Sequence, residues 1–127
     1  MGKDKSKPNI PKLKIIKHID NVFDREYLFL IGDLDQANKY TLRTLDTELD
    51  VDESVIGCYQ RIAPKSVIWL QSFNNTPEDI SILAHECLHA TFDLMEYVGI
   101  EYDGEENNEA FTHYLGSLVR SFLKFYQ

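Results

Sequence analysis

TPEDISILAHECLHATFDLMEYV, residues 76–98, carries the signals of one long helix. Thr76 can cap its first turn, Pro77 suits the first helical position, and two acidic residues follow where the helix dipole favours them. Gly99 is a natural stop, because glycine readily adopts the left-handed conformation that ends many helices. We therefore predict a helix from residue 78 to about residue 98. Its packing side chains are expected to be Ile80, Leu83, Ala84, Cys87, Leu88 and Leu94.

Four shorter segments on the N-terminal side of this helix have strand-like composition or alternation. They cover residues 12–19, 26–31, 54–62 and 66–73. A helix over residues 33–49 is a weaker prediction, because three threonines lie within it. A second long helix is predicted from Glu105 to about Tyr126, after a turn at residues 102–104. Strands followed by two long helices predict an α+β fold with a small twisted sheet, in one domain spanning residues 13–127.

The length and composition of the chain restrict its class. With 127 residues, 43% of them hydrophobic and 27% charged, it resembles one ordinary globular domain. No apolar run approaches the ~18 residues that cross a bilayer, and no secretion signal follows the N-terminal lysines. Two cysteines, Cys58 and Cys87, are fewer than a disulfide-stabilised secreted domain of this length usually carries. These features predict a cytoplasmic protein without a transmembrane segment.

The net charge of −8 is distributed unevenly. Residues 1–17 hold six of the thirteen basic residues and one acid, and residues 1–12 are expected to form a flexible basic arm. The remainder has seven basic and twenty acidic residues, so it repels phosphate backbones and argues against nucleic acid as a partner. Gly2 and Ser6 also fit the Met-Gly-x-x-x-Ser pattern of N-myristoylation, which makes membrane anchoring the alternative to a solvated arm.

The predicted long helix contains His85-Glu86-Cys87-Leu88-His89, a His-Glu-x-x-His sequence. Residues four apart lie about 40° apart around a helix and one turn apart along it, so both imidazoles can reach one cation. Glu86 lies about 60° from His89 and can face a metal-bound water without being a ligand. Cys87 points about 200° away from His85 and is expected to pack in the core. The alternative is that both histidines are core residues satisfied by hydrogen bonds, with no metal and no catalytic role.

A catalytic zinc ion needs three protein ligands and one open position. Because two histidines come from one helix, the third ligand is expected from a different element. The residues that follow the helix leave six candidates open, namely Glu101, Asp103, Glu105, Glu106, Glu109 and His113.

One of these candidates lies in a longer pattern. Glu109 follows His89 by twenty residues, within the sequence Asn-Glu-Ala-Phe-Thr at 108–112. This arrangement resembles the gluzincin metallopeptidases of the thermolysin type, in which His-Glu-x-x-His is followed about twenty residues later by a zinc-binding glutamate in an Asn-Glu-Ala-x-Ser/Thr context. The resemblance covers about residues 66–120. It extends to Ala90, Asp93 and Gly116.

The resemblance implies a zincin-like fold, a Zn²⁺ cofactor held by His85, His89 and Glu109, and a peptide or protein substrate. Zinc lowers the pKa of its bound water toward ~7, and Glu86 would take the water's proton as general base and pass it to the leaving amine. By the same resemblance, SVIWLQSF at residues 66–73 would be the edge strand that pairs with an extended substrate.

The chain departs from the thermolysin type in two respects. Those enzymes carry an aspartate four residues after the glutamate, where it orients a zinc-bound histidine, and here that position is His113. The chain also lacks the helical subdomain that forms the far wall of their cleft, so the minimal single-domain gluzincins are the better analogy. His113, and Tyr102 in the loop between the two ligand helices, are the candidates for stabilising an oxyanion. The alternative is that each of them is an ordinary packing or surface residue without a role in catalysis.

These departures leave a second function open, namely a zinc-binding or regulatory module that retains the metallopeptidase fold without turnover. DNA-associated proteases of the SprT type share the helix motif, but the acidic body of the chain disfavours that class.

Overall fold

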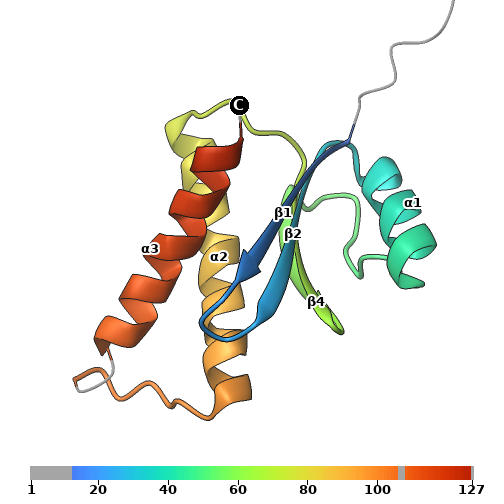
Figure 1. Ribbon diagram of the computed structural model, residues 1–127. Coiled ribbons are helices and arrows are strands. Elements are labelled where there is room, and N and C mark those ends of the chain that lie inside the picture. Colours follow the sequence, from blue (N-terminus) through green and yellow to red (C-terminus); the bar gives the residue numbers. More distant parts are fainter. Residues whose placement is uncertain (1–12, 106–107, 127) are drawn as a thin grey trace, which may run out of the picture.

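A computed structural model describes residues 13–105 and 108–126 of the chain. Within this part, four strands form one sheet: β1 (Lys14–Asp20), β2 (Arg25–Ile31), β3 (Gly57–Ile62) and β4 (Lys65–Leu70). Three helices accompany them: α1 (Leu34–Leu45), α2 (Pro77–Val98) and α3 (Asn108–Phe125). The long helices α2 and α3 lie side by side on one face of the sheet, and α1 lies on the other (Figure 1). The layers are therefore helix, sheet, helix.

The sheet is mixed, with the strand order β1-β2-β4-β3. β1 and β2 form an antiparallel hairpin, β2 and β4 run parallel, and β4 pairs antiparallel with β3. α1 and the loop after it carry the chain from the end of β2 to the far edge of the sheet, where β3 begins. A tight turn at Ala63 and Pro64 then returns β4 between β3 and β2. β1 and β3 are consequently the two edge strands.

Both faces of β2 and β4 are buried, which explains why these strands are apolar almost throughout. Tyr27 and Phe29 pack in a core with α2 and α3, whereas Leu28 and Leu30, which alternate with them, pack in a second core with α1. Helix α2 contributes Leu83, Cys87 and Ala90 to the first core, and α3 contributes Leu118 and Phe122. The sheet thus fixes α2 by its apolar face.

The signals at the ends of α2 act as the sequence predicts. The backbone N–H of Asp79 donates to Thr76 Oγ1 at 3.1 Å, and Pro77 occupies the first turn. Gly99 ends the helix in the left-handed region with a φ of 84°. The two helix ends are thereby fixed locally, independently of the site between them.

Most of the predicted elements are confirmed. The α+β class, the four strands and both long helices are present, and the helix predicted over residues 33–49 exists in the shorter form of α1. Cys87 is fully buried, as expected. The packing role of Ile80 and Leu88 was wrong, because their side chains are 37% and 40% exposed. The arm at residues 1–12 and positions 106–107 lie outside the described residues.

The prediction that no helix spans a membrane can be compared with the structure. Across residues 13–105 and 108–126, each helix is too short or too polar to cross a bilayer.

The aromatic group at the C-terminal half of α3 should carry much of the stability. Phe122 is fully buried, and its ring lies 5.2 Å from Phe29 and 4.8 Å from Phe73 between centroids. Phe122→Ala should lower the free energy of unfolding by about 3–5 kcal/mol, because it removes these contacts and leaves a cavity. Phe125→Ala is the matched control on the same helix, since that ring is 53% exposed and should cost less than about 1 kcal/mol. Urea denaturation measures both, and equal losses would contradict this description of the core.

Candidate metal centre

Three ligand-type side chains gather on one turn of α2. The ligand atoms of His85, Glu86 and His89 all lie within 4.8 Å of one another. The two Nε2 atoms of the histidines are 3.2 Å apart, and the rings stand edge to face. Both histidines are exposed, whereas Glu86 is only 7% exposed. The helix therefore carries two imidazoles on its exposed side and one carboxylate that is buried next to them.

The separation of the two imidazoles fits a shared zinc ion. Zinc binds histidine nitrogen at about 2.0–2.1 Å, so two nitrogens of a tetrahedral site lie roughly 3.3–3.4 Å apart. The Nε2 atoms of His85 and His89 are close to that spacing. The same distance also suits a hydrogen bond between the two imidazoles. The donor set of two imidazoles beside a carboxylate is one that zinc accepts.

Glu86 is the chemically unusual member of the group. It receives no hydrogen bond from the described residues, although more than nine-tenths of it is buried. Burial raises the pKa of its carboxyl, while the charges of His85 and His89 act in the opposite direction. A carboxylate that lacks a hydrogen-bond partner and has a raised pKa is suited to accept a proton from a bound molecule.

Glu86 lines two hollows that meet between α2 and the edge strand β3. One hollow is lined by Tyr59, His89 and Asp93 among others, and the second by Val55, Ile82 and His85 among others. Gly57 lies at the junction and lines both. A Cβ at position 57 would come within 2.9 Å of Ile82, so the glycine lets strand and helix approach closely. The group of His85, Glu86 and His89 thus opens onto a groove along the edge strand β3.

The strand predicted to pair with substrate was the wrong one. Residues 66–73 were expected at the edge of the sheet, but β4 is hydrogen-bonded to β2 on one side and to β3 on the other. The strand at that edge is β3. The composition explains this result, because β4 is apolar on both faces as an interior strand must be, whereas β3 carries the polar residues Gln60 and Arg61.

The structure does not bring Glu109 into the group of close ligand atoms. Glu109 lies in the first turn of α3, with its side chain 80% exposed, and it pairs with His113 at 3.0 Å. His113 is also 80% exposed, rather than directed at the metal-ligating group. The ligand role of Glu109 and the outer role of His113 therefore stay predictions.

Tyr102 lies in an aromatic cluster at the loop between α2 and α3. Its ring packs edge to face against Phe92 of α2 and Phe111 of α3, with centroids 6.3 Å and 5.1 Å away. It is 54% exposed. Its contacts are those of a packing residue at the joint of the two helices, and a role at an oxyanion stays a prediction.

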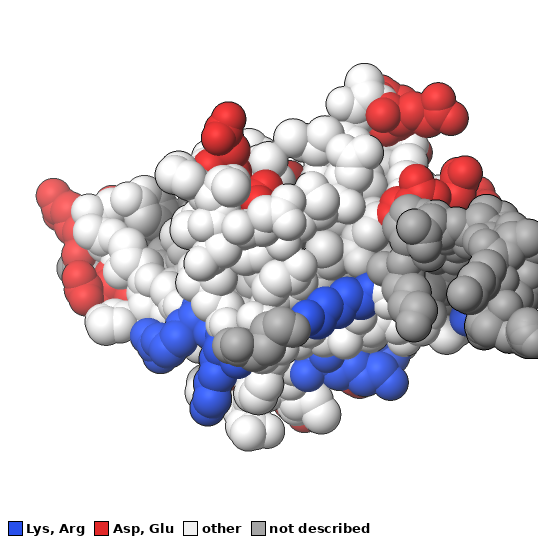
Figure 2. Space-filling model, turned by 90° about the horizontal axis from the view of Figure 1, so that it is seen from above, with Lys and Arg blue, Asp and Glu red and all other residues white. Residues whose placement is uncertain are grey.

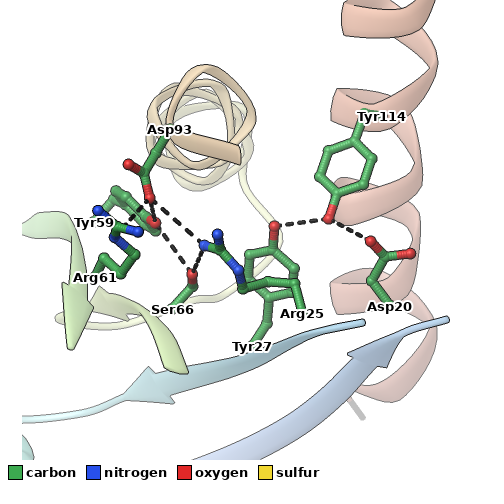
Figure 3. A network of polar contacts seen from close by, with 8 residues as sticks. All are labelled: Asp20, Arg25, Tyr27, Tyr59, Arg61, Ser66, Asp93 and Tyr114. Atoms are coloured by element: carbon green, nitrogen blue, oxygen red, sulfur yellow. Dashed lines mark hydrogen bonds and ion pairs between the residues drawn. The ribbon is translucent and has the colours of Figure 1, made fainter. Parts of the chain in front are cut away.

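A buried polar network holds α2 against the sheet (Figure 3). Arg25, only 6% exposed, donates to Ser66 at 2.6 Å and forms an ion pair with Asp93 at 3.6 Å. The Tyr59 hydroxyl of β3 also donates to Asp93, and Arg61 of β3 lies 3.5 Å from the same carboxylate oxygen. Asp93 follows His89 by one turn, as the resemblance noted, but its partners lie in the sheet.

The same strand anchors α3. The Tyr27 hydroxyl lies 2.7 Å from that of Tyr114, which in turn donates to Asp20 at 2.8 Å (Figure 3). Tyr27 is fully buried, and burial raises its pKa to about 12. Arg25 and Tyr27 lie two residues apart and point to the same face of β2. Neighbouring side chains of one strand thus position both long helices.

Comparisons with family models, with curated proteins and with solved structures gave no match.

The residues that the sequence left unnoticed belong to β3. Gly57 and Tyr59 shape the groove. The available signal was the glycine inside the strand-like run at residues 54–62, because an isolated glycine in a strand often marks a close backbone approach. The cysteines offer no competing chemistry. Both are free, and burial raises the pKa of Cys58 and of Cys87 to about 12, so neither is a thiolate at neutral pH.

Removing the anchor of α2 should destabilise the protein. Asp93→Ala leaves the buried guanidinium of Arg25 without its carboxylate and should lower the free energy of unfolding by about 2–4 kcal/mol. Glu96→Ala is the matched control, because Glu96 is exposed on the same helix and should change stability by less than about 0.5 kcal/mol. Thermal and urea denaturation measure both variants. A loss in Asp93→Ala no larger than in the control would show that the network does not position α2.

Proposed function

We propose that this protein is a zinc-dependent peptide hydrolase whose general base is Glu86. The observation that carries the proposal is the position of Glu86. It is buried, receives no hydrogen bond from the described residues, and lies between an imidazole pair at zinc-ligand spacing and the edge strand β3. Each of these features alone has an ordinary structural explanation. Their coincidence at one turn of one helix favours catalysis.

The metal would be held by His85 and His89, with Glu109 as the proposed third ligand. Glu109 must leave His113 and reach the imidazole pair. Breaking the ion pair with His113 costs little, because a pair whose members are both 80% exposed contributes at most about 1 kcal/mol. Helix α3, which carries Glu109, packs beside α2. A bound zinc ion would supply Lewis-acid polarisation of a carbonyl and acidify a water molecule.

The chain's own residues would perform the remaining tasks. The exposed backbone edge of β3 would hydrogen-bond an extended peptide as an added strand, which aligns the scissile bond along the groove. Glu86 would accept a proton from the attacking water at its carboxylate and return it to the leaving amine. The raised pKa of Glu86 brings its proton affinity closer to what neutral pH requires.

A second candidate is a non-catalytic zinc-binding or regulatory module with the same architecture. The observation that favours it is the exposure of Glu109, His113 and Tyr102. Neither Glu109 nor His113 belongs to the group of close ligand atoms on α2. A cytoplasmic location is part of both proposals.

Zinc binding is the first test. Purified protein should contain close to one zinc per chain by mass spectrometry, because two pre-positioned imidazoles and a third ligand satisfy the ion. His89→Ala should lose nearly all of it, and Glu109→Ala should lose most. His18, which lies on β1 outside the group, provides the matched control, so His18→Ala should retain the metal. Full retention in Glu109→Ala would remove that residue from the ligand set.

Hydrolysis is the second test. Glu86→Gln keeps the shape of the side chain but cannot accept the proton, and it should lower peptidase activity about 10²–10⁴-fold with zinc content unchanged. The measurement is the rate on a fluorogenic peptide library with zinc-loaded protein. Glu78→Gln, which changes an exposed acid of the same helix, should leave the rate unchanged. A zinc-loaded wild type that cleaves none of the peptides would favour the non-catalytic module.

A further inference from the structure

A third hollow lies beside the groove, at the C-terminal end of α2. It is about 840 Å³ in volume, within the range of small-molecule sites. Its lining consists of Phe92, Glu96, Gly99, Ile100, Glu101 and Tyr102. Phe92 and Glu96 also line the hollow that contains Glu86 and His89, so the two hollows lie next to each other along α2. A chain lying along the groove would thus place one of its side chains at the end of α2.

The walls of this hollow are aromatic. Phe92 and Tyr102 are 46% and 54% exposed, unusually open for rings of their size. Both rings pack against Phe111, which is buried in the first half of α3, with centroids 5.4 Å and 5.1 Å away. The rings are therefore supported from behind and present their remaining surface to the hollow. Such surfaces can bind the stem and the cationic head of a long side chain.

The hollow is negatively charged. Its two charged lining residues, Glu96 and Glu101, are both acidic, and within the described chain neither carboxylate has a salt bridge or a hydrogen bond. The sequence around them reinforces this, because residues 66–119 contain ten acids and no lysine or arginine. Opposite charges are segregated elsewhere as well: at one end of the molecule, Lys and Arg gather along one side and Asp and Glu along the other (Figure 2).

We infer that this hollow is a specificity subsite for a lysine or arginine side chain of the peptide substrate. The inference rests on the proposed function, since it assigns a substrate class to the same groove. The aliphatic stem would lie against Phe92 and Ile100, and the cationic head would meet the ring of Tyr102 and the carboxylate of Glu101. An acidic side chain would be repelled. An apolar one would desolvate both carboxylates without compensation, which costs free energy.

Binding to a variant that cannot turn over isolates this subsite from catalysis. The probes are fluorescent peptides of alanine and glycine that carry lysine, norleucine or glutamate at one position, which is moved along the peptide. Fluorescence anisotropy with Glu86→Gln protein, at 0.15 M salt and with zinc present or absent, gives the affinities. At one position lysine should bind about tenfold more tightly than norleucine, and glutamate should bind most weakly.

Charge removal provides the decisive comparison. Adding Glu96→Gln and Glu101→Gln to the Glu86→Gln protein should abolish the preference for lysine. Lysine should lose its carboxylate partner and bind more weakly, whereas norleucine should bind equally or more tightly, because it no longer desolvates two charges. Glu105→Gln is the matched control, because Glu105 is exposed in the same loop but does not line the hollow. Equal affinity for lysine and norleucine, a lysine preference that survives the double substitution, or no binding of any peptide would overturn the inference.

The outcome also separates this inference from the proposed function. Wild type that cleaves peptides without preference for a basic residue would retain the hydrolase and remove the subsite. A lysine preference in binding by a protein that cleaves nothing would retain the subsite and remove the hydrolase.

Discussion

The guanidinium of Arg25 is buried in strand β2, and Asp93 of helix α2 is the carboxylate that neutralises it. A buried charge left without a partner costs several kcal/mol, so α2 cannot slide or rotate without breaking this ion pair. Tyr59 of the edge strand binds the same carboxylate, which ties α2 and β3 to each other. Two residues further along β2, Tyr27 reaches Tyr114 and fixes α3. The placement of both long helices thus depends on one face of one strand.

This anchor also sets the direction of Glu86. Positions 86 and 93 are seven residues apart, so their side chains leave the helix only about 20° apart. Because Asp93 is held against Tyr59 of β3, Glu86 must face the same strand two turns earlier, and both residues line one hollow. His85 and His89 lie to the side of this direction and remain at the exposed rim. A structural ion pair and a candidate general base therefore share one constraint.

The sequence predicted the features that depend on local patterns. Thr76, Pro77 and Gly99 specify the ends of α2 because capping acts within one turn, and the helical period brings His85 next to His89. Prediction from the sequence failed for features that depend on contacts between residues far apart in the chain. β4 lies inside the sheet because the chain turns back after β3 and inserts β4 between β3 and β2. The spacing of residues in the sequence does not determine this strand order.

The exposure of Leu88 and the orientation of Glu109 also depend on contacts between residues far apart in the chain. Leu88 fits the apolar pattern of a core residue, yet it is 40% exposed on the face of α2 that also carries the histidines. The orientation of Glu109 depends on how the loop after Gly99 returns the chain to α3, and the His-Glu-x-x-His spacing does not determine this. A sequence motif can therefore indicate two imidazoles on one helix more securely than a third ligand twenty residues away.

X-ray absorption spectroscopy of the zinc-loaded protein tests directly whether His85 and His89 bind the metal. We expect two imidazole nitrogens at about 2.0–2.1 Å from the zinc, with oxygen ligands at about 2.0–2.2 Å completing the coordination shell. The spectrum of His89→Ala protein should lose one imidazole contribution or show no bound zinc. A sulfur ligand at about 2.3 Å, or a shell without two imidazoles in the wild type, would contradict the account, because it would place the metal away from His85, His89 and the carboxylate of Glu86.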